Sequence, residues 1–234
     1  YISSPEIKGS LLGMVLFTSE LMEPPSRTNV RMSIRNLVSL KIVSELARQG
    51  RITDEGGVVA KIASKGKMPD VGISKAILAG RYYGCEKTVI IIAAIMQASG
   101  GNIRGIEDFF FKHKESKTKQ IIKEYQHKYG DLFSFFNLYM EYYLHSGRMD
   151  KIELQNWARD RSVKLRSLEN VKEKAKEIYR ALRNILEEVE TIREPPFKDR
   201  TDLALLALVK GYFTNICELQ KGGKTPKYSN LYPV

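Results

Sequence analysis

Four basic residues follow the only tryptophan of this chain and are the first candidates for chemistry. Arg159, Arg161, Lys164 and Arg166 come shortly after Trp157. Arginine and lysine side chains bind phosphate oxygens without reading base sequence. The spacing predicts that all four lie on one helix and point from separate faces of it. Two interpretations remain open for this group, a set of nucleic-acid phosphate contacts and an ordinary solvated surface.

Further basic residues gather in two other places. One group is Lys112, Lys114, Lys117 and Lys119, and the other is Lys210 near Tyr212 with Lys221, Lys224 and Lys227 near Tyr228. Solvated surface is the preferred interpretation of the group at 112–119, because runs of charge are usually exposed. The aromatic residues between 133 and 143 could stack on bases. Their helical spacing nevertheless predicts that most of them lie in the core.

Motifs for catalysis or metal binding are incomplete. Gly222-Gly223-Lys224-Thr225 ends like a phosphate-binding loop, but Glu218 stands where that motif needs its first glycine. The three histidines lie on polar segments, and none has the spacing of a metal ligand set. No serine or cysteine can be placed with a histidine and an acid. We therefore expect no catalytic residue, no cofactor and no metal in this chain.

Composition points to a polyanionic partner. The formal net charge is +11 and the pI is near 9.5, which favours nucleic acid or an anionic membrane surface. Cys85 and Cys217 lie in apolar surroundings and are expected to be reduced core residues of an intracellular protein. We expect neither a signal peptide nor a transmembrane run within this sequence. The start at Tyr1, without an initiator methionine, suggests a piece of a longer polypeptide.

Hydrophobic periodicity predicts a mainly helical chain. The apolar run from Val89 to Met96 predicts a central helix over residues 86–98. Apolar positions from Leu165 to Val189 predict a long amphipathic helix that Pro195-Pro196 would stop. Asp131 and Asp150 are expected to cap helices.

The two ends of the chain have their own patterns. Three short helices are expected, the first starting near Ser3, with a short turn region at 50–53 before the third. Three such helices with a brief extended segment between them are typical of a winged-helix or helix-turn-helix module. A last helix is expected from Asp202 to Leu219, followed by a short polar and aromatic tail.

Ten short motifs occur in one order along nearly the whole chain. They are Pro5-Glu6-Ile7, Pro24-Pro25, Ile52-Thr53 with Gly56, Met68-Pro69, Lys75 to Leu78, Gly84-Cys85 with its helix, Gly130-Asp131, Trp157, Arg166-Ser167-Leu168 and Gly211-Tyr212-Phe213. In this order they resemble the C-terminal region of the DEAH-box (DEAH/RHA) helicases of superfamily 2. No single motif is specific; their order carries the resemblance.

The resemblance implies a domain order. Residues 1–68 would form a winged-helix module, 69–196 the helical ratchet (HA2) domain, and 197–234 a terminal helix with the start of a truncated OB-fold. The whole helicase would be an ATP-dependent nucleic-acid motor whose RecA-like domains, absent here, bind ATP and Mg²⁺. This region would bind single-stranded RNA or DNA without sequence preference and couple motor opening to translocation. The residues proposed to contact nucleic acid are Arg159, Arg161, Lys164, Arg166, Lys210, Lys224 and Lys227.

Other interpretations stay open. In the resembled family these surfaces also dock activator proteins, so a protein-interaction module with an acidic partner is the alternative. A free-standing winged-helix protein that binds duplex DNA is a third, but it leaves the helical bundle unexplained. Leu132 replaces the histidine of the family's Gly-Asp-His element, Ala158 replaces a cysteine, and Gly72 replaces a proline. These departures indicate a divergent member, for which a viral source is one interpretation.

Overall fold

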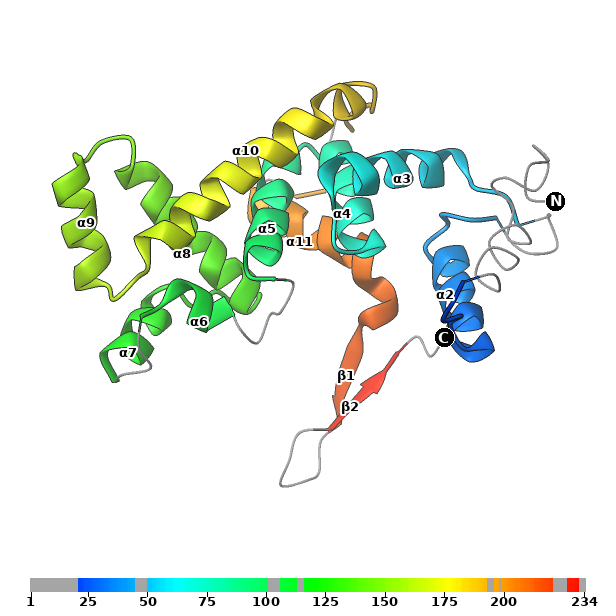
Figure 1. Cartoon of the computed structure of the whole chain (residues 1–234), viewed down its shortest axis with the longest axis horizontal. Helices are drawn as coiled ribbons and strands as arrows, with labels where there is room; N and C mark the ends of the chain where they lie inside the picture. Colours follow the sequence, from blue (N-terminus) through cyan, green and yellow to red (C-terminus); the bar gives the residue numbers. More distant parts are fainter. Residues whose placement is uncertain are drawn as a thin grey trace.

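A computed structural model describes residues 21–44, 50–100, 106–112, 116–192, 196–197, 199–220 and 227–231. This part of the chain is mainly helical, and its only named strands form a two-stranded sheet near the C-terminus (Figure 1). The prediction of a mainly α-helical chain with a short β segment at its end is thus confirmed. The predicted first helix near Ser3 lies outside the described residues.

The elements follow one another with short connections. In chain order they are α2 (Arg27–Ser39), α3 (Asp54–Gly66), α4 (Val71–Tyr82), α5 (Glu86–Ala98), α6 (Ile106–Phe110), α7 (Ser116–Glu124), α8 (Asp131–His145), α9 (Lys151–Asp160), α10 (Leu165–Glu187), α11 (Arg200–Tyr212), the 3-10 turn η3 (Phe213–Asn215), β1 (Cys217–Gln220) and β2 (Lys227–Asn230).

Helix α5 is the centre of the main core, as the apolar run predicts. Its side chains from Val89 to Met96 are almost all buried, and Ile92 and Ile95 are fully enclosed. Helices α4, α8, α10 and α11 all pack against it. A helix that is apolar on every side is stable only when neighbours cover every side, and this is why α5 lies in the middle.

Helix α10 is the long amphipathic helix that the sequence predicts. It buries Leu168, Val171, Ile178, Leu182 and Leu186 along one stripe. It runs diagonally across the molecule in Figure 1, from α8 and α9 to the level of α4.

The C-terminal end of α10 is anchored to the α4–α5 turn. Arg81 donates from Nε to the carbonyl oxygen of Leu186 at 2.7 Å and to that of Val189 at 3.2 Å. Carbonyl groups at a helix C-terminus lack intrahelical partners, and a cation there also complements the helix dipole. The backbone amide of Ile192 donates to Tyr82 and extends the same attachment.

Helices α4 and α11 touch through their backbones. A Cβ atom on Gly211 would lie against the Gly72 carbonyl, 3.0 Å from its carbon and 3.1 Å from the Cβ of Ala76. Close to this crossing, the hydroxyl of Tyr212 donates to both carboxylate oxygens of Asp70 at 3.0 Å. Asp70 is the N-cap of α4, so the end of α11 is fixed at the beginning of α4.

A smaller core lies beside α2. A second buried cluster consists of Leu40, Ile42, Val43 and Val59. Val43 also forms an isolated antiparallel β-bridge with Ile52. Helix α2 has no buried residue of its own. Its half-buried residues Ile34, Leu37 and Val38 pack against this cluster.

Lys75 adds a polar contact at the C-terminal end of α2. Its side chain is 9% exposed, and its ammonium group pairs with Glu55 at 3.0 Å and donates to the carbonyl oxygen of Leu40. One buried cation thus connects α4, α3 and the end of α2.

Replacing Lys75 with methionine is expected to lower the free energy of unfolding by about 1–3 kcal/mol, because the Leu40 carbonyl loses its charged donor. Urea denaturation measures this loss, and hydrogen exchange should show faster exchange in α2. The exposed Lys61 of α3 provides the control variant Lys61→Met. An equal loss in both variants would contradict the role given to Lys75.

Several sequence expectations are wrong in detail. Gly130, with a positive φ of 91°, is the N-cap of α8, and Asp131 is its first residue. Asp150 does cap α9, in a full capping box with Glu153. The last helix ends at Tyr212 and not at Leu219.

The segment after α11 turns into a strand because it pairs with a partner. Cys217–Gln220 pairs antiparallel with Lys227–Asn230. In that strand Cys217 is exposed, contrary to the expectation that it is a core residue, whereas Cys85 is buried as expected.

Candidate nucleic-acid interface

The four basic residues after Trp157 do not share one helix. Helix α9 ends at Asp160 and α10 begins at Leu165. Between them Ser162 adopts a left-handed φ of 53°, and Val163 forms an antiparallel bridge with Phe111. The prediction of a single helix is therefore wrong, because a contact with a distant segment interrupts it.

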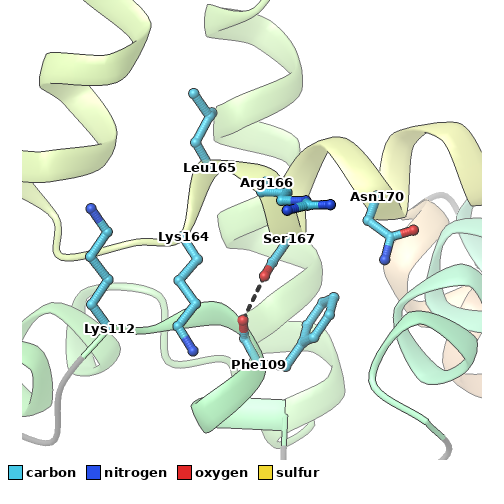
Figure 2. A pocket seen from close by; sticks show the side chains of 7 residues that line it. All are labelled: Phe109, Lys112, Lys164, Leu165, Arg166, Ser167 and Asn170. Carbon is cyan, nitrogen blue, oxygen red and sulfur yellow. Dashed lines mark hydrogen bonds between the residues drawn. The ribbon is translucent and has the colours of Figure 1, made fainter.

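This bridge builds a groove between the end of α6 and the start of α10. Backbone hydrogen bonds join Lys112 to Ser162 at 3.0 Å and Lys164 to Phe110 at 2.7 Å. The hydroxyl of Ser167 donates to the carbonyl oxygen of Phe109 at 2.7 Å. The groove has a volume of about 510 Å³, and Figure 2 shows its lining: Phe109, Lys112, Lys164, Leu165, Arg166, Ser167 and Asn170.

The groove concentrates positive charge. Lys112, Lys164 and Arg166 line it, and none of its lining residues is acidic. Lys164 donates from Nζ to the carbonyl oxygen of Asp108 at 2.6 Å, which turns it toward α6. Within the described residues, Lys112 and Arg166 form no ion pair. Further along α10, by contrast, Lys174, Lys176 and Arg183 pair with glutamates on the same helix.

The backbone of α10 adds to this charge. Lys164 is the N-cap of α10, no side chain caps this end, and its first turn contains no acidic residue. The first amides of a helix lack intrahelical acceptors, and the helix dipole places partial positive charge there. An uncapped helix start beside three cations is suited to an anion such as a phosphate group.

Arg161 lies in a different environment, in contact with α8. Its guanidinium group is 2.9 Å from Oε1 of Glu141, donates to the hydroxyl of Tyr125 at 3.0 Å, and lies over the ring of Trp157. Glu141 also accepts hydrogen bonds from Tyr125 at 2.6 Å and from Trp157 at 3.0 Å, and His145 lies 3.4 Å away. This cluster connects α7, α8 and α9 and uses the charge of Arg161 internally.

The pKa values in this cluster follow from its contacts. Burial acts to raise the pKa of Glu141, but the hydrogen bonds from Tyr125 and Trp157 and the charge of Arg161 outweigh burial and lower it. Burial, together with its hydrogen bond to Glu141, raises the pKa of Tyr125. Glu141 therefore remains an ionised acceptor and Tyr125 a protonated donor, which is typical of a structural network.

The remaining predicted residues do not join the groove. Arg159 is exposed on α9 and donates to Asn156 at 2.9 Å. Lys210 is exposed in the last turn of α11, which leads into β1 and lies apart from α6 in Figure 1. Lys224 lies outside the described residues, as do the other residues of the loop at 222–225. Lys227 is the first residue of β2, and its side chain is outside the described part.

Sequence reasoning missed part of the groove. Lys112 belongs to the group interpreted as solvated surface and is exposed, but it also lines the groove. Lys119 of that group is exposed on α7 and does not line the groove. The side chains of Lys114 and Lys117 are outside the described residues. Ser167 is a motif residue, but only the fold reveals its bond to Phe109.

The described histidines lie apart from the groove. His127 and His145 are half-buried, the latter beside Glu141, and His113 is not among the described residues. The described residues contain no group of three or more histidine, cysteine, aspartate or glutamate side chains suited to a metal.

No helix in the described ranges combines the length and apolar character needed to cross a membrane. A scan against protein-family models finds no match to the chain, and a search of curated proteins finds none either.

Proposed function

We propose that this chain is a non-catalytic, nucleic-acid-binding accessory region of an NTP-dependent helicase, of the kind found at the C-terminus of DEAH-box enzymes. It holds the phosphates of single-stranded RNA or DNA without reading base sequence, while motor domains elsewhere hydrolyse the nucleotide. In this proposal helices α2 and α3 belong to the winged-helix module at 1–68, and α4 to α10 belong to the ratchet domain at 69–196.

The groove between α6 and α10 is the observation that carries this proposal. It combines Lys112, Lys164 and Arg166 with an uncapped helix start, in a chain of net charge +11. Phosphate contacts dominate the affinity of sequence-independent binding. The motif order that resembles DEAH-box helicases supports the same function, and only one of its motifs, Arg166-Ser167-Leu168, contributes to the groove.

The double variant Lys112→Gln/Arg166→Gln tests the proposal. Titration of a labelled single-stranded oligoribonucleotide, followed by fluorescence anisotropy, should show binding that weakens with salt. Each lost phosphate contact lowers the slope of log K against log salt by about 0.7 for single strands. For the double variant the magnitude of this slope should therefore be smaller by about 1.4. Its affinity near 0.1 M salt should be lower by about tenfold or more.

The control removes the same charge elsewhere. Lys119 and Arg180 are exposed on α7 and α10 and do not line the groove, so Lys119→Gln/Arg180→Gln should bind much like the unmodified chain. Equal losses in the two double variants would mean that net charge, and not the groove, determines binding. No binding at any salt concentration would reject the function for this chain and favour the protein-interaction alternative, in which an acidic activator uses this surface.

A further inference from the structure

An aromatic side chain accompanies the cations of the groove. The ring of Phe109 is half-buried and lines the same groove as Lys112 and Arg166. Figure 2 shows this ring on the side of Arg166 and Asn170, with Lys112 and Lys164 on the other side. The groove thus contains both a surface for a flat apolar group and donors for an anion.

The position of Phe109 is fixed from two directions. Its ring packs edge-on against the fully buried ring of Phe110, with centroids 5.0 Å apart and an interplanar angle of 76°. Its carbonyl oxygen accepts the hydrogen bond from Ser167 on α10. An aromatic ring held in this way can stack on a planar ligand at little cost in side-chain entropy.

The size of the groove suits a small planar ligand with a charged group. Its volume of about 510 Å³ falls within the range of roughly 300–1,000 Å³ of small-molecule pockets. The amide of Asn170 and the hydroxyl of Ser167 add polar groups beside Phe109. Stacking on aromatic side chains is tolerant of base identity, because every base has a π-face.

We infer that the groove takes one unstacked nucleotide, whose base packs on Phe109 while its phosphate is held by Lys112, Arg166 and the start of α10. This inference rests on the proposed function and deepens it. Bases of a duplex are stacked and paired and cannot reach Phe109, so the groove selects single strands.

The test compares two oligoribonucleotides of equal length and charge, one with bases and one made of abasic residues, on the full 234-residue chain. Base stacking on an aromatic side chain corresponds to a change in affinity of about fivefold to a hundredfold. The abasic strand should bind weaker by at least fivefold, and a blunt duplex should compete poorly. Equal affinity for the two single strands overturns the inference without any variant.

Variants then assign the effect to Phe109. Phe109→Leu should weaken binding of the base-containing strand at least fivefold and leave binding of the abasic strand unchanged. Phe109→Tyr keeps an aromatic ring and should bind the base-containing strand as the unmodified chain does. A loss that is the same for both strands, or no loss for either, contradicts the role of Phe109.

The two proposals fail in different ways. If Lys112→Gln/Arg166→Gln weakens both single strands but Phe109→Leu has no selective effect, the phosphate contacts stand and the nucleotide site is wrong. If the charge variant affects neither strand, the proposed function itself fails.

Discussion

Replacing Gly211 with alanine is expected to destabilise the fold by about 2 kcal/mol, although alanine is normally the better residue in a helix by about 1 kcal/mol. The new methyl group would lie against the Gly72 carbonyl of α4, where backbone and not a flexible side chain is in the way. Helices α4 and α11 must then separate, and overpacking of this kind typically costs about 1–3 kcal/mol or more. For a chain of this length each kcal/mol lowers Tm by about 2–4 °C.

Gly57 provides the matched control. It lies in α3, and a Cβ atom there would meet nothing within 4 Å. Gly57→Ala should therefore stabilise the chain by up to about 1 kcal/mol. Thermal unfolding followed by circular dichroism should move Tm in opposite directions for the two variants. A rise in Tm for Gly211→Ala would contradict this prediction, because it would show that α4 and α11 can accommodate the methyl group without a loss of stability.

The second large effect is expected at Glu141. Glu141→Ala removes the common acceptor of Tyr125, Trp157 and Arg161. Breaking a fully buried ion pair costs about 3–5 kcal/mol. Because the side chain of Glu141 is 29% exposed, we expect the free energy of unfolding to fall by no more than about 3 kcal/mol. Urea denaturation measures it, and the fluorescence of Trp157, the only tryptophan, reports on the cluster itself.

The pH dependence separates the charge of Glu141 from its packing. Its pKa is lower in the folded chain than in the unfolded chain, so the unfolded state binds the proton more tightly. This contribution is complete above the unfolded pKa of about 4.3 and is lost as the pH falls through the lower folded value. The difference between unmodified chain and Glu141→Gln should shrink below about pH 4. Glu169→Ala, at an exposed site on α10, should change stability little at any pH.

Local patterns predict the parts of this fold that local forces determine. The run from Val89 to Met96 identifies the central helix because its apolar character exceeds what any surface helix tolerates. The 3.6-residue repeat identifies α10 for a different reason, because it places the apolar side chains of that helix on one face. The capping box at Asp150 sets the start of α9 with residues three positions apart.

Features that depend on distant contacts escape such patterns. Neither glycine nor proline marks the break at Ser162; it follows from the bridge between Phe111 and Val163. Cys217–Gln220 becomes a strand only because Lys227–Asn230 pairs with it. The candidate site shares this difficulty: Lys164 and Arg166 can be proposed from sequence, but nothing local brings Phe109 and Lys112 beside them.

Helix α10 has mechanical consequences because both of its ends are attached. At the groove, backbone hydrogen bonds and the hydroxyl of Ser167 connect it to α6. At its far end, Arg81 donates a hydrogen bond to the carbonyl oxygen of Leu186. Its 23 residues span about 35 Å. A helix fixed at both ends is stiff along its axis, so under the proposed function a force on a strand bound at α6 would be transmitted along α10 to the α4–α5 turn.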